Sequence, residues 1–228
     1  MQFEDMNWMD VESYLKQDNR VVVITGACEQ HAYLSLLTDI RVPTAIANAA
    51  CQRENVLVAP PLNFGISPYF TTYPGTLSLK PETFAAIVRE VLEGLIKQGF
   101  QRILVSNGHG GNSGVLTPLM IELSTAHVGT NLVLFEAWRD PAVFEVAQAA
   151  GLAPNHANWA EAFPFTVVGD MPSGDKPAPD FPRTGSAEAQ RAALGDGNFG
   201  GPYRASDEVM QKMFDAAVES MVKLLKAL

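Results

Sequence analysis

Short apolar runs alternate with segments of helical periodicity along this chain. Residues 20–25 form a continuous β-branched run, which is typical of a strand buried on both faces. Residues 55–59, 102–105 and 131–135 are further short apolar runs and predict three more strands. Gly-containing turns follow the first and third runs, at the carboxyl ends of strands, where open α/β sheets place their ligand sites.

Helical patterns separate these runs. In residues 82–98 the apolar positions recur at the helical spacing, and Gly99 is a suitable C-cap. We expect Pro43 in the first turn of a helix and Met9-Asp10 as the cap of another. The full set of expected helices is 10–15, 38–52, 82–98, 116–126, 141–151 and 206–228. Residues 62–81 predict a loop, and the proline-rich residues 171–185 predict a surface excursion.

The order strand, helix, strand, helix, strand predicts an α/β fold. We expect a single domain over residues 1–228, a three-layer sandwich with a mostly parallel central sheet and helices on both faces. The hydrophobic fraction of 47% is enough for a buried core.

Composition excludes several classes of partner. A net charge of −9 argues against nucleic acid and anionic membrane surfaces. No apolar run is long enough for a transmembrane helix, and the acidic start does not resemble a signal peptide. Two cysteines form no disulfide framework, so we expect a cytoplasmic protein.

Candidate chemistry gathers around three of the four histidines. His31 and His109 each follow a predicted strand, and His156 lies five residues before Glu161. The carboxylates Glu29 and Asp39 lie close to His31 in sequence, and Glu29 points the same way as His31 on extended backbone. Imidazole and carboxylate ligands suit zinc, manganese or iron.

Each of these residues also has a structural interpretation. A strand-end histidine is commonly held by hydrogen bonds alone, and Asp39 suits a helix N-terminus. His127 ends a predicted helix and is interpreted as structural, because a histidine there suits the helix dipole. Cys28 is expected to be a packing residue, with a nucleophile as the alternative. We expect the glycines around His109 to allow positive φ angles and to clear room around the imidazole.

Taken together, the motifs resemble those of the creatininase (creatinine amidohydrolase) family. The main pieces are Gly26-Ala27-Cys28-Glu29-Gln30-His31 with Thr38-Asp39, Tyr73-Pro74-Gly75-Thr76-Leu77-Ser78-Leu79, Asn107-Gly108-His109-Gly110-Gly111-Asn112, and His156-Ala157 before Glu161, of which the second and third are the specific ones. A weaker piece is Gly197-Asn198-Phe199-Gly200-Gly201-Pro202. The pieces follow the family's order over almost the whole chain.

The resemblance implies two divalent metal ions, zinc, manganese or iron, that share a carboxylate and a water. Asp39 would bridge the ions, with Glu29 and His109 completing one site and His31 and Glu161 the other. The ions would lower the pKa of the shared water, and the resulting hydroxide would attack a carbonyl.

The remaining catalytic role and the assembly are also implied. His156 would be the general acid or base that protonates the leaving nitrogen. The resemblance further implies a homo-oligomer, possibly a hexamer.

The chain also departs from the family pattern. The interval from Glu29 to Asp39 is one residue shorter, and Gly110 and Gly111 stand where creatininase proper has an acidic ligand. Aromatic residues replace polar ones elsewhere, so creatinine itself is a poor candidate substrate. We expect the substrate site to include Tyr69, Phe70, Ser78, Gly110 and Trp159. Phe163 is a further candidate for an apolar wall, and each aromatic side chain could instead be packing.

Three functions remain open. The leading prediction is hydrolysis of a C–N bond in a small cyclic amide or formamide. The second keeps the metal ions and opens a cyclic ketone or lactone, such as an oxidised sugar or inositol. The third is a non-catalytic binding member, which the complete ligand set disfavours.

Overall fold

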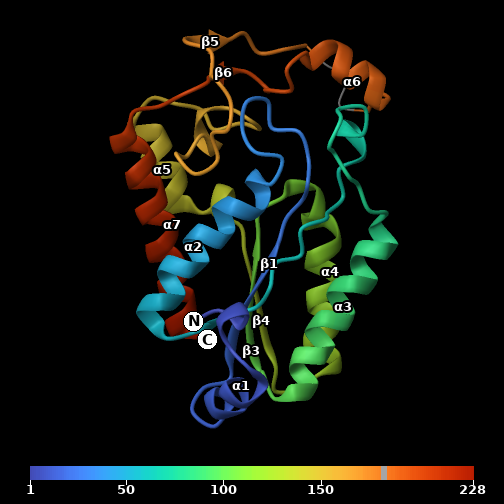
Figure 1. Ribbon diagram of the computed structural model, residues 1–228, viewed down its shortest axis with the longest axis vertical. Coiled ribbons are helices and arrows are strands. Elements are labelled where there is room, and N and C mark those ends of the chain that lie inside the picture. Colours follow the sequence, from blue (N-terminus) through green and yellow to red (C-terminus); the bar gives the residue numbers. More distant parts are fainter. Residues whose placement is uncertain (181–183) are drawn as a thin grey trace.

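The computed structural model describes residues 1–180 and 184–228 as an α/β fold with three layers (Figure 1). The central sheet holds four parallel strands in the order β2-β1-β3-β4. Their bounds are β1 Arg20–Thr25, β2 Leu57–Val58, β3 Arg102–Asn107 and β4 Asn131–Phe135. The predicted fold class, a mostly parallel sheet with helices on both faces, is confirmed.

Helices cover both faces of the sheet (Figure 1). Helices α3 and α4 lie on one face, and α2, α5 and α7 lie on the other. The helices are α1 Trp8–Leu15, α2 Thr38–Glu54, α3 Pro81–Gln98, α4 Ser113–Ala126, α5 Pro141–Ala149, α6 Ala187–Leu194 and α7 Asp207–Ala227. Among the described residues, no helix is long and apolar enough to cross a membrane.

Strand β1 shows why the sheet needs both layers. Its residues Val21, Val22, Val23 and Ile24 are all fully buried. Val22 and Ile24 pack in the core with α2, α5 and α7, whereas Val21 and Val23 pack in the core with α3 and α4. Successive side chains of a strand point to opposite faces, so a continuous β-branched run requires cover on both sides.

Several predicted boundaries need correction. Asn7, not Met9-Asp10, caps α1, since its side chain accepts hydrogen bonds from the backbone N–H groups of Met9 and Asp10. Strand β2 is shorter than predicted, and α4 begins at Ser113, three residues earlier than predicted. Pro43 lies inside α2, beyond its first turn, so it cannot donate the helical hydrogen bond to the carbonyl of Asp39.

The segments outside the sandwich gather above the carboxyl edge of the sheet (Figure 1). They include the short 3₁₀ turns η2 Pro68–Phe70, η4 Ala137–Arg139 and η5 Trp159–Glu161, the β5-β6 pair and helix α6. Strand β5 is Asp175–Lys176 and β6 is Gly201–Pro202. Residues 171–180 are exposed or half-buried, as predicted for the excursion, while 181–183 of that prediction lie outside the described residues.

Candidate metal centre

The candidate site lies where the chain changes direction across the sheet. From β1 the chain passes through α2 to β2 on one side, and then returns through α3 to β3 on the other side of β1. Such a switch point leaves a crevice at the carboxyl ends of the two strands. Glu29 and His31 follow β1, His109 follows β3, and Asp39 opens α2, so all four converge there.

Two clusters of possible metal ligands share Asp39. Glu29, Asp39 and His109 form one, and His31, Asp39 and Glu161 form the other. In each cluster the candidate ligand atoms lie within 4.8 Å of one another. The structure therefore brings together the five residues that the sequence singled out, with Asp39 between the two sets.

Asp39 presents one carboxylate oxygen to each histidine. Its Oδ1 lies 3.0 Å from Nε2 of His31, and its Oδ2 lies 2.8 Å from Nδ1 of His109. Nδ1 of His109 is also 3.4 Å from Oε1 of Glu29, and Nε2 of His31 is 3.7 Å from Oε2 of Glu161. This is the arrangement that a bridging carboxylate would need.

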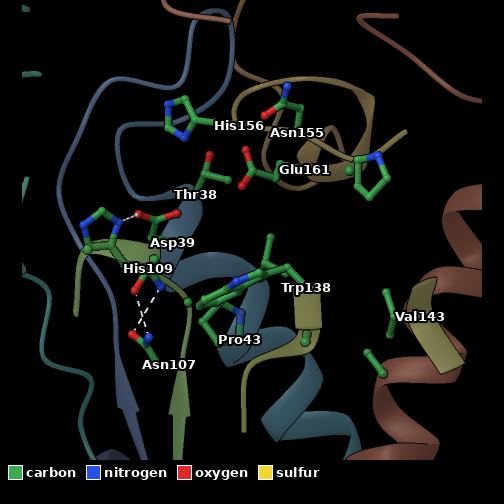
Figure 2. Close-up of a pocket in the computed structure, with 18 of the residues that line it drawn as sticks. Thr38, Asp39, Pro43, Asn107, His109, Trp138, Val143, Asn155, His156 and Glu161 are labelled. Atoms are coloured by element: carbon green, nitrogen blue, oxygen red, sulfur yellow. Dashed lines mark hydrogen bonds and ion pairs between the residues drawn. The ribbon is translucent and has the colours of Figure 1, made fainter. Parts of the chain in front are cut away.

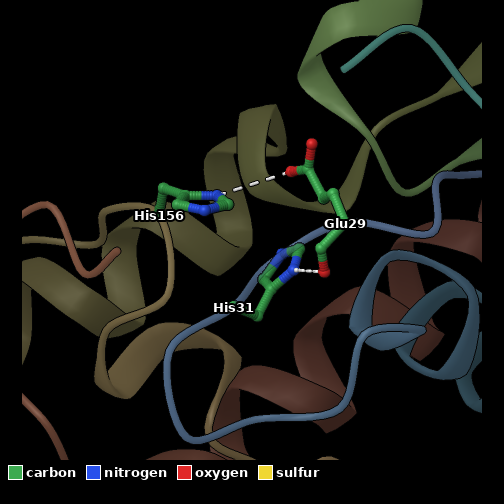
Figure 3. Close-up of side chains that lie close together, drawn as sticks. All are labelled: Glu29, His31 and His156. Carbon is green, nitrogen blue, oxygen red and sulfur yellow. Dashed lines mark hydrogen bonds and ion pairs between the residues drawn. The ribbon is translucent and has the colours of Figure 1, made fainter. Parts of the chain in front are cut away.

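Backbone carbonyls select which ring nitrogen of each histidine faces the cluster. Nε2 of His109 lies 2.8 Å from the carbonyl oxygen of Ile66, and Nδ1 of His31 lies 3.2 Å from that of Glu29 (Figure 3). A carbonyl only accepts, so these nitrogens must carry the hydrogen. The opposite nitrogens, Nδ1 of His109 and Nε2 of His31, keep a free lone pair in the neutral rings, as metal ligands require.

Unpaired buried atoms support a cation at this place. Glu29 Oε2, His31 Nε2 and Asp39 Oδ2 are buried and take part in no well-aligned hydrogen bond, although some lie close to one another. Buried polar atoms without hydrogen bonds are rare and costly. Carboxylate oxygens and imidazole nitrogens that converge without pairing fit a divalent ion of the zinc, manganese or iron type.

His156 differs from the other two histidines because one of its nitrogens faces a hydrogen-bond donor instead of a carbonyl. The amide nitrogen of Gln30 lies 2.9 Å from Nε2 of His156. The same amide donates to the carbonyl of Gly197, and its oxygen accepts from the N–H of Ala32, so its orientation is fixed. Gln30 must therefore donate to His156, whose neutral ring then carries its hydrogen on Nδ1, 3.8 Å from Oε1 of Glu29 (Figure 3).

The charges of the cluster set the protonation of these groups. Burial opposes the charged form of His31, but the charges of Asp39 and Glu161 outweigh it and raise its pKa to about 10. Burial lowers the pKa of His156 to about 4, and the nearby His31 adds to this effect. Burial also raises the pKa of Glu161 to about 7, against the opposing charge of His31. Near neutral pH His156 is thus uncharged.

The glycines around His109 serve close packing. Neither Gly108, Gly110 nor Gly111 has a positive φ, so that part of the expectation is wrong. A Cβ on Gly108 would lie 1.9 Å from the carbonyl oxygen of Asp39, and one on Gly111 would lie 2.4 Å from Nε2 of His109. The second contact confirms the expected clearance around the imidazole.

A buried polar network holds the His109 loop. The amide of Asn107 donates to the carbonyl of His109 and to Oε1 of Glu136, at 2.8 Å each. Ser113 donates to the same Glu136 oxygen at 2.5 Å, and Arg139 pairs with the other oxygen at 2.9 Å. Sequence reasoning missed Glu136; its only signal was its position directly after a predicted strand.

A cavity of about 610 Å³ opens onto both clusters (Figure 2). Tyr69, Phe70 and Gly110, expected at the substrate site, line it, and so does Phe163. The ring of Phe70 stacks on that of His156 with the centroids 4.9 Å apart. Phe70 therefore borders His156 directly.

Two of the expected substrate residues lie elsewhere. Trp159 is fully buried in the core, where its indole N–H donates to the carbonyl of Ala153, so it does not line the cavity. Ser78 is also outside the lining. Its hydroxyl accepts from the N–H of Ser67 and donates to the carbonyl of Leu79, which ties two loop segments together.

The remaining candidates take no part in the centre. His127 is the C-cap residue of α4, at the helix end that the sequence predicted. Burial raises the pKa of the Cys28 thiol, and the adjacent Glu29 adds to this. Its Sγ lies 3.3 Å from the carbonyl of Gly75. A thiol with a raised pKa is a weak nucleophile at neutral pH.

Comparison with known proteins decides the family. The sequence model of the creatininase family, described as creatinine amidohydrolase, matches residues 4–225. The chain belongs to the creatininase family. The resemblance drawn from the motifs is confirmed, and it extends over the sheet, the ligand clusters and helix α7.

Relatives within the creatininase family carry different activities in their names. Creatinine amidohydrolase of Pseudomonas putida is 27% identical over 156 residues, which is 62% of this chain and 60% of that protein. A mycofactocin precursor peptide peptidase of Mycobacterium tuberculosis is 32% identical over 108 residues, 42% of this chain and 43% of that protein. A 3-dehydro-scyllo-inosose hydrolase of Thermotoga maritima is 28% identical over 110 residues, 47% of this chain and 35% of that protein.

These alignments span 60% or less of each relative's length. Solved creatininase structures match over almost the whole chain. A crystal structure of creatinine amidohydrolase (creatininase) has a TM-score of 0.79 at 23% identity, covering 99% of this chain and 96% of that one. A manganese creatininase structure matches with a TM-score of 0.79 at 22% identity, covering 99% of this chain and 97% of that one. A Zn–Zn type structure of a creatininase variant matches with the same values. At this identity the likeness establishes the creatininase fold.

Proposed function

We propose that this protein is a dinuclear metal-dependent hydrolase that cleaves the C–N bond of a small cyclic amide or formamide. One observation carries the proposal: two clusters of buried ligand atoms share Asp39. Beside them lies His156, whose nitrogen nearest Glu29 carries a hydrogen instead of a lone pair. A purely structural cluster would not need three buried polar atoms without aligned partners.

The residues divide into ligands and a proton carrier. Asp39 would bridge two ions, with Glu29 and His109 on one side and His31 and Glu161 on the other. Gln30 keeps a hydrogen on Nδ1 of His156, so we assign His156 to proton transfer. The zinc and manganese creatininase structures support the choice of ion.

Two divalent cations, when bound, polarise a carbonyl and lower the pKa of a water that they share. The protein supplies the remaining parts. His156 is neutral at pH 7 and holds a hydrogen on the nitrogen nearest Glu29. The ring can carry a proton to a leaving nitrogen by taking up the one that the attacking water loses. Phe70 stacks on the ring and limits its movement. The cavity holds the substrate between these groups.

The direct test is hydrolysis by protein reconstituted with zinc or manganese, screened against cyclic amides and formamides. Asp39→Ala should lose both bound metal and activity, and His156→Ala should keep the metal while the amide rate falls by roughly 10²–10⁴-fold. Activity that survives Asp39→Ala would show that the bridging assignment is wrong. A purified protein with well under one ion per chain would favour a non-catalytic binding function instead.

A second candidate is ring opening of a cyclic ketone or lactone, favoured by the likeness to 3-dehydro-scyllo-inosose hydrolase. The two reactions differ in their leaving group. An amide nitrogen must be protonated as it leaves, whereas a lactone oxygen is a better leaving group and depends less on that proton. His156→Ala should therefore slow amides far more than lactones if the first proposal is right, and an equal loss on both would favour the second.

A further inference from the structure

The cavity at the metal centre is chemically divided. At one end it is lined by His156 and by four of the five residues of the two clusters, namely Glu29, Asp39, His109 and Glu161. At the other end it runs between helices α2, α5 and α7, where its lining is apolar. We call this second part the apolar arm and define it by Val42, Ile46, Trp138, Val143, Phe144 and Met213.

The apolar arm joins the polar end without a break. Figure 2 draws Trp138 in the middle of the cavity, with Asp39 and His109 on one side and Val143 on the other. Trp138 comes from the turn η4, next to Glu136, and so its backbone is tied to the network that holds the His109 loop. A molecule bound at the clusters would therefore meet this wall directly.

The apolar arm offers nothing to a charged group. Every Asp, Glu and His in the cavity lining belongs to the metal centre, and the lining contains no Lys or Arg. Two of its aromatic side chains keep much of their surface uncovered: Trp138 is 39% and Phe144 is 47% exposed. Uncovered apolar surface beside a reactive centre favours a ligand that covers it.

We propose that the substrate carries an apolar group, a hydrocarbon chain or an aromatic ring, which lies in the apolar arm while the scissile amide lies at the clusters. This inference deepens the proposed function and rests on it for the position of the amide. A small polar ring alone would leave most of the 610 Å³ cavity without contact. The arm and the centre form one cavity, and for that reason we assign the arm to the substrate.

The apolar arm can be tested without metal. The uncharged dye N-phenyl-1-naphthylamine should bind the chelator-treated protein with a rise in fluorescence, because the arm requires no ion. Absence of dye binding would overturn the inference, whatever the metal content. If the dye signal falls as the protein concentration rises, and light scattering shows association over the same range, the arm is an interface between copies and the inference is also wrong.

The link between arm and centre needs metal-loaded protein. Alkyl hydroxamates bind divalent ions through their oxygens and carry a tail of chosen length, so their affinity can be measured by calorimetry without any turnover. Each buried methylene should tighten binding roughly fourfold. Octanohydroxamate has six more methylenes than acetohydroxamate, so it should bind up to about 4,000-fold tighter if all are buried, and it should displace the dye. Equal affinities would overturn the inference and leave the proposed hydrolase intact.

A matched pair of variants locates the effect. Phe144→Asp places a charge on the wall at a half-exposed position, so the fold should tolerate it. It should weaken the dye and octanohydroxamate roughly tenfold or more and leave acetohydroxamate unchanged. Ile121→Asp makes a comparable change on α4, on the opposite face of the sheet, where Ile121 is 64% exposed, and should alter none of these affinities. Equal effects of the two variants would contradict the assignment.

Discussion

Gln30 donates a hydrogen bond to Nε2 of His156, which lies 126 residues away in the sequence. This contact determines that Nδ1 of the neutral His156 ring carries the hydrogen. Without it, Nδ1 of His156 would be a further candidate ligand, since Glu29, His31 and His156 also lie close enough to hold an ion. With it, the neutral ring has a hydrogen where a ligand would need a lone pair. The difference between a metal ligand and a proton carrier thus depends on one amide.

Replacing that donor by an acceptor should move the hydrogen of the neutral His156 ring to its other nitrogen. In Gln30→Glu the side chain accepts instead of donating, so Nε2 of His156 should carry the hydrogen. Nitrogen chemical shifts of histidine-labelled protein would record the change. We expect the amide rate to fall roughly 10–100-fold with the metal content unchanged. Gln52→Glu, at an exposed position of α2, is the control. An unaltered His156 spectrum in Gln30→Glu would refute the argument.

Alanine substitutions at the glycines around His109 should destabilise the fold only where the glycine is closely packed. Gly108→Ala would place Cβ 1.9 Å from the Asp39 carbonyl, and Gly111→Ala 2.1 Å from that of Ile66. Each should lower the free energy of unfolding by about 1–3 kcal/mol. Gly110→Ala meets no atom within 4 Å and should stay within about 0.5 kcal/mol of the parent protein. Denaturant titrations of the three variants would check this order, and equal losses would contradict it.

Metal binding should stabilise the fold. At a free metal concentration of a hundred times Kd, the free energy of unfolding should rise by about 2.7 kcal/mol. For a chain of 228 residues, this corresponds to a rise in Tm of roughly 5–10 °C. Thermal unfolding with zinc or manganese, and again after chelation, measures the shift. Asp39→Asn should abolish most of it, and a variant that retains the full shift would exclude Asp39 as a ligand.

Metal binding should also release protons. In the metal-free protein the pKa of His31 is about 10, because Asp39 and Glu161 outweigh its burial, so the ring is protonated at pH 7. A metal must displace that proton, and the apparent affinity should fall by up to about tenfold per pH unit below 10. Calorimetry in two buffers of different ionisation enthalpy would count the protons. His127→Gln removes a histidine at the end of α4 and should leave the count unchanged.

The same raised pKa has the opposite consequence for the metal-free fold. A group that binds its proton more tightly when folded stabilises the protein fully below its unfolded pKa, about 6.5 for histidine. For His31 that contribution should decline as the pH rises from about 6.5 to 10. Denaturant midpoints of chelator-treated protein across this range would show the decline, and a rising midpoint would contradict it.

The Glu136 network should be costly to break. Glu136→Ala leaves one hydrogen of the Asn107 amide and the hydroxyl of Ser113 without their buried acceptor. We expect a loss of about 1–3 kcal/mol in the free energy of unfolding. Glu122→Ala removes an exposed ion pair with Arg89 and should cost less than about 1 kcal/mol. Equal losses in the two variants would argue against the network.

The sequence was informative where chemistry depends on local pattern. Continuous β-branched runs require a sheet with two covered faces, so the strands and the fold class were predictable. Parallel strands bring their carboxyl ends to one edge, so the grouping of His31 with His109 was also predictable. The short helix α6 was missed because eight residues carry little periodicity.

The remainder depended on tertiary contacts. Trp159 lies between His156 and Glu161 in sequence, but the tight turn η5 directs it into the core. Gln30 lies inside a recognised motif, yet nothing local indicates that it reaches His156. Pro43 shows the same limit: its helix was predicted, but not its place beyond the first turn.

The metal centre and the apolar arm share helix α2 but otherwise use different elements of the chain. The ligands come from strand ends, the start of α2 and the turn η5, whereas α5 and α7 contribute only to the wall of the arm. Substitutions on α5 and α7 can therefore change the shape of that wall without removing a ligand. Such a division allows substrate preference to change through substitutions on two helices while the set of candidate ligands stays the same.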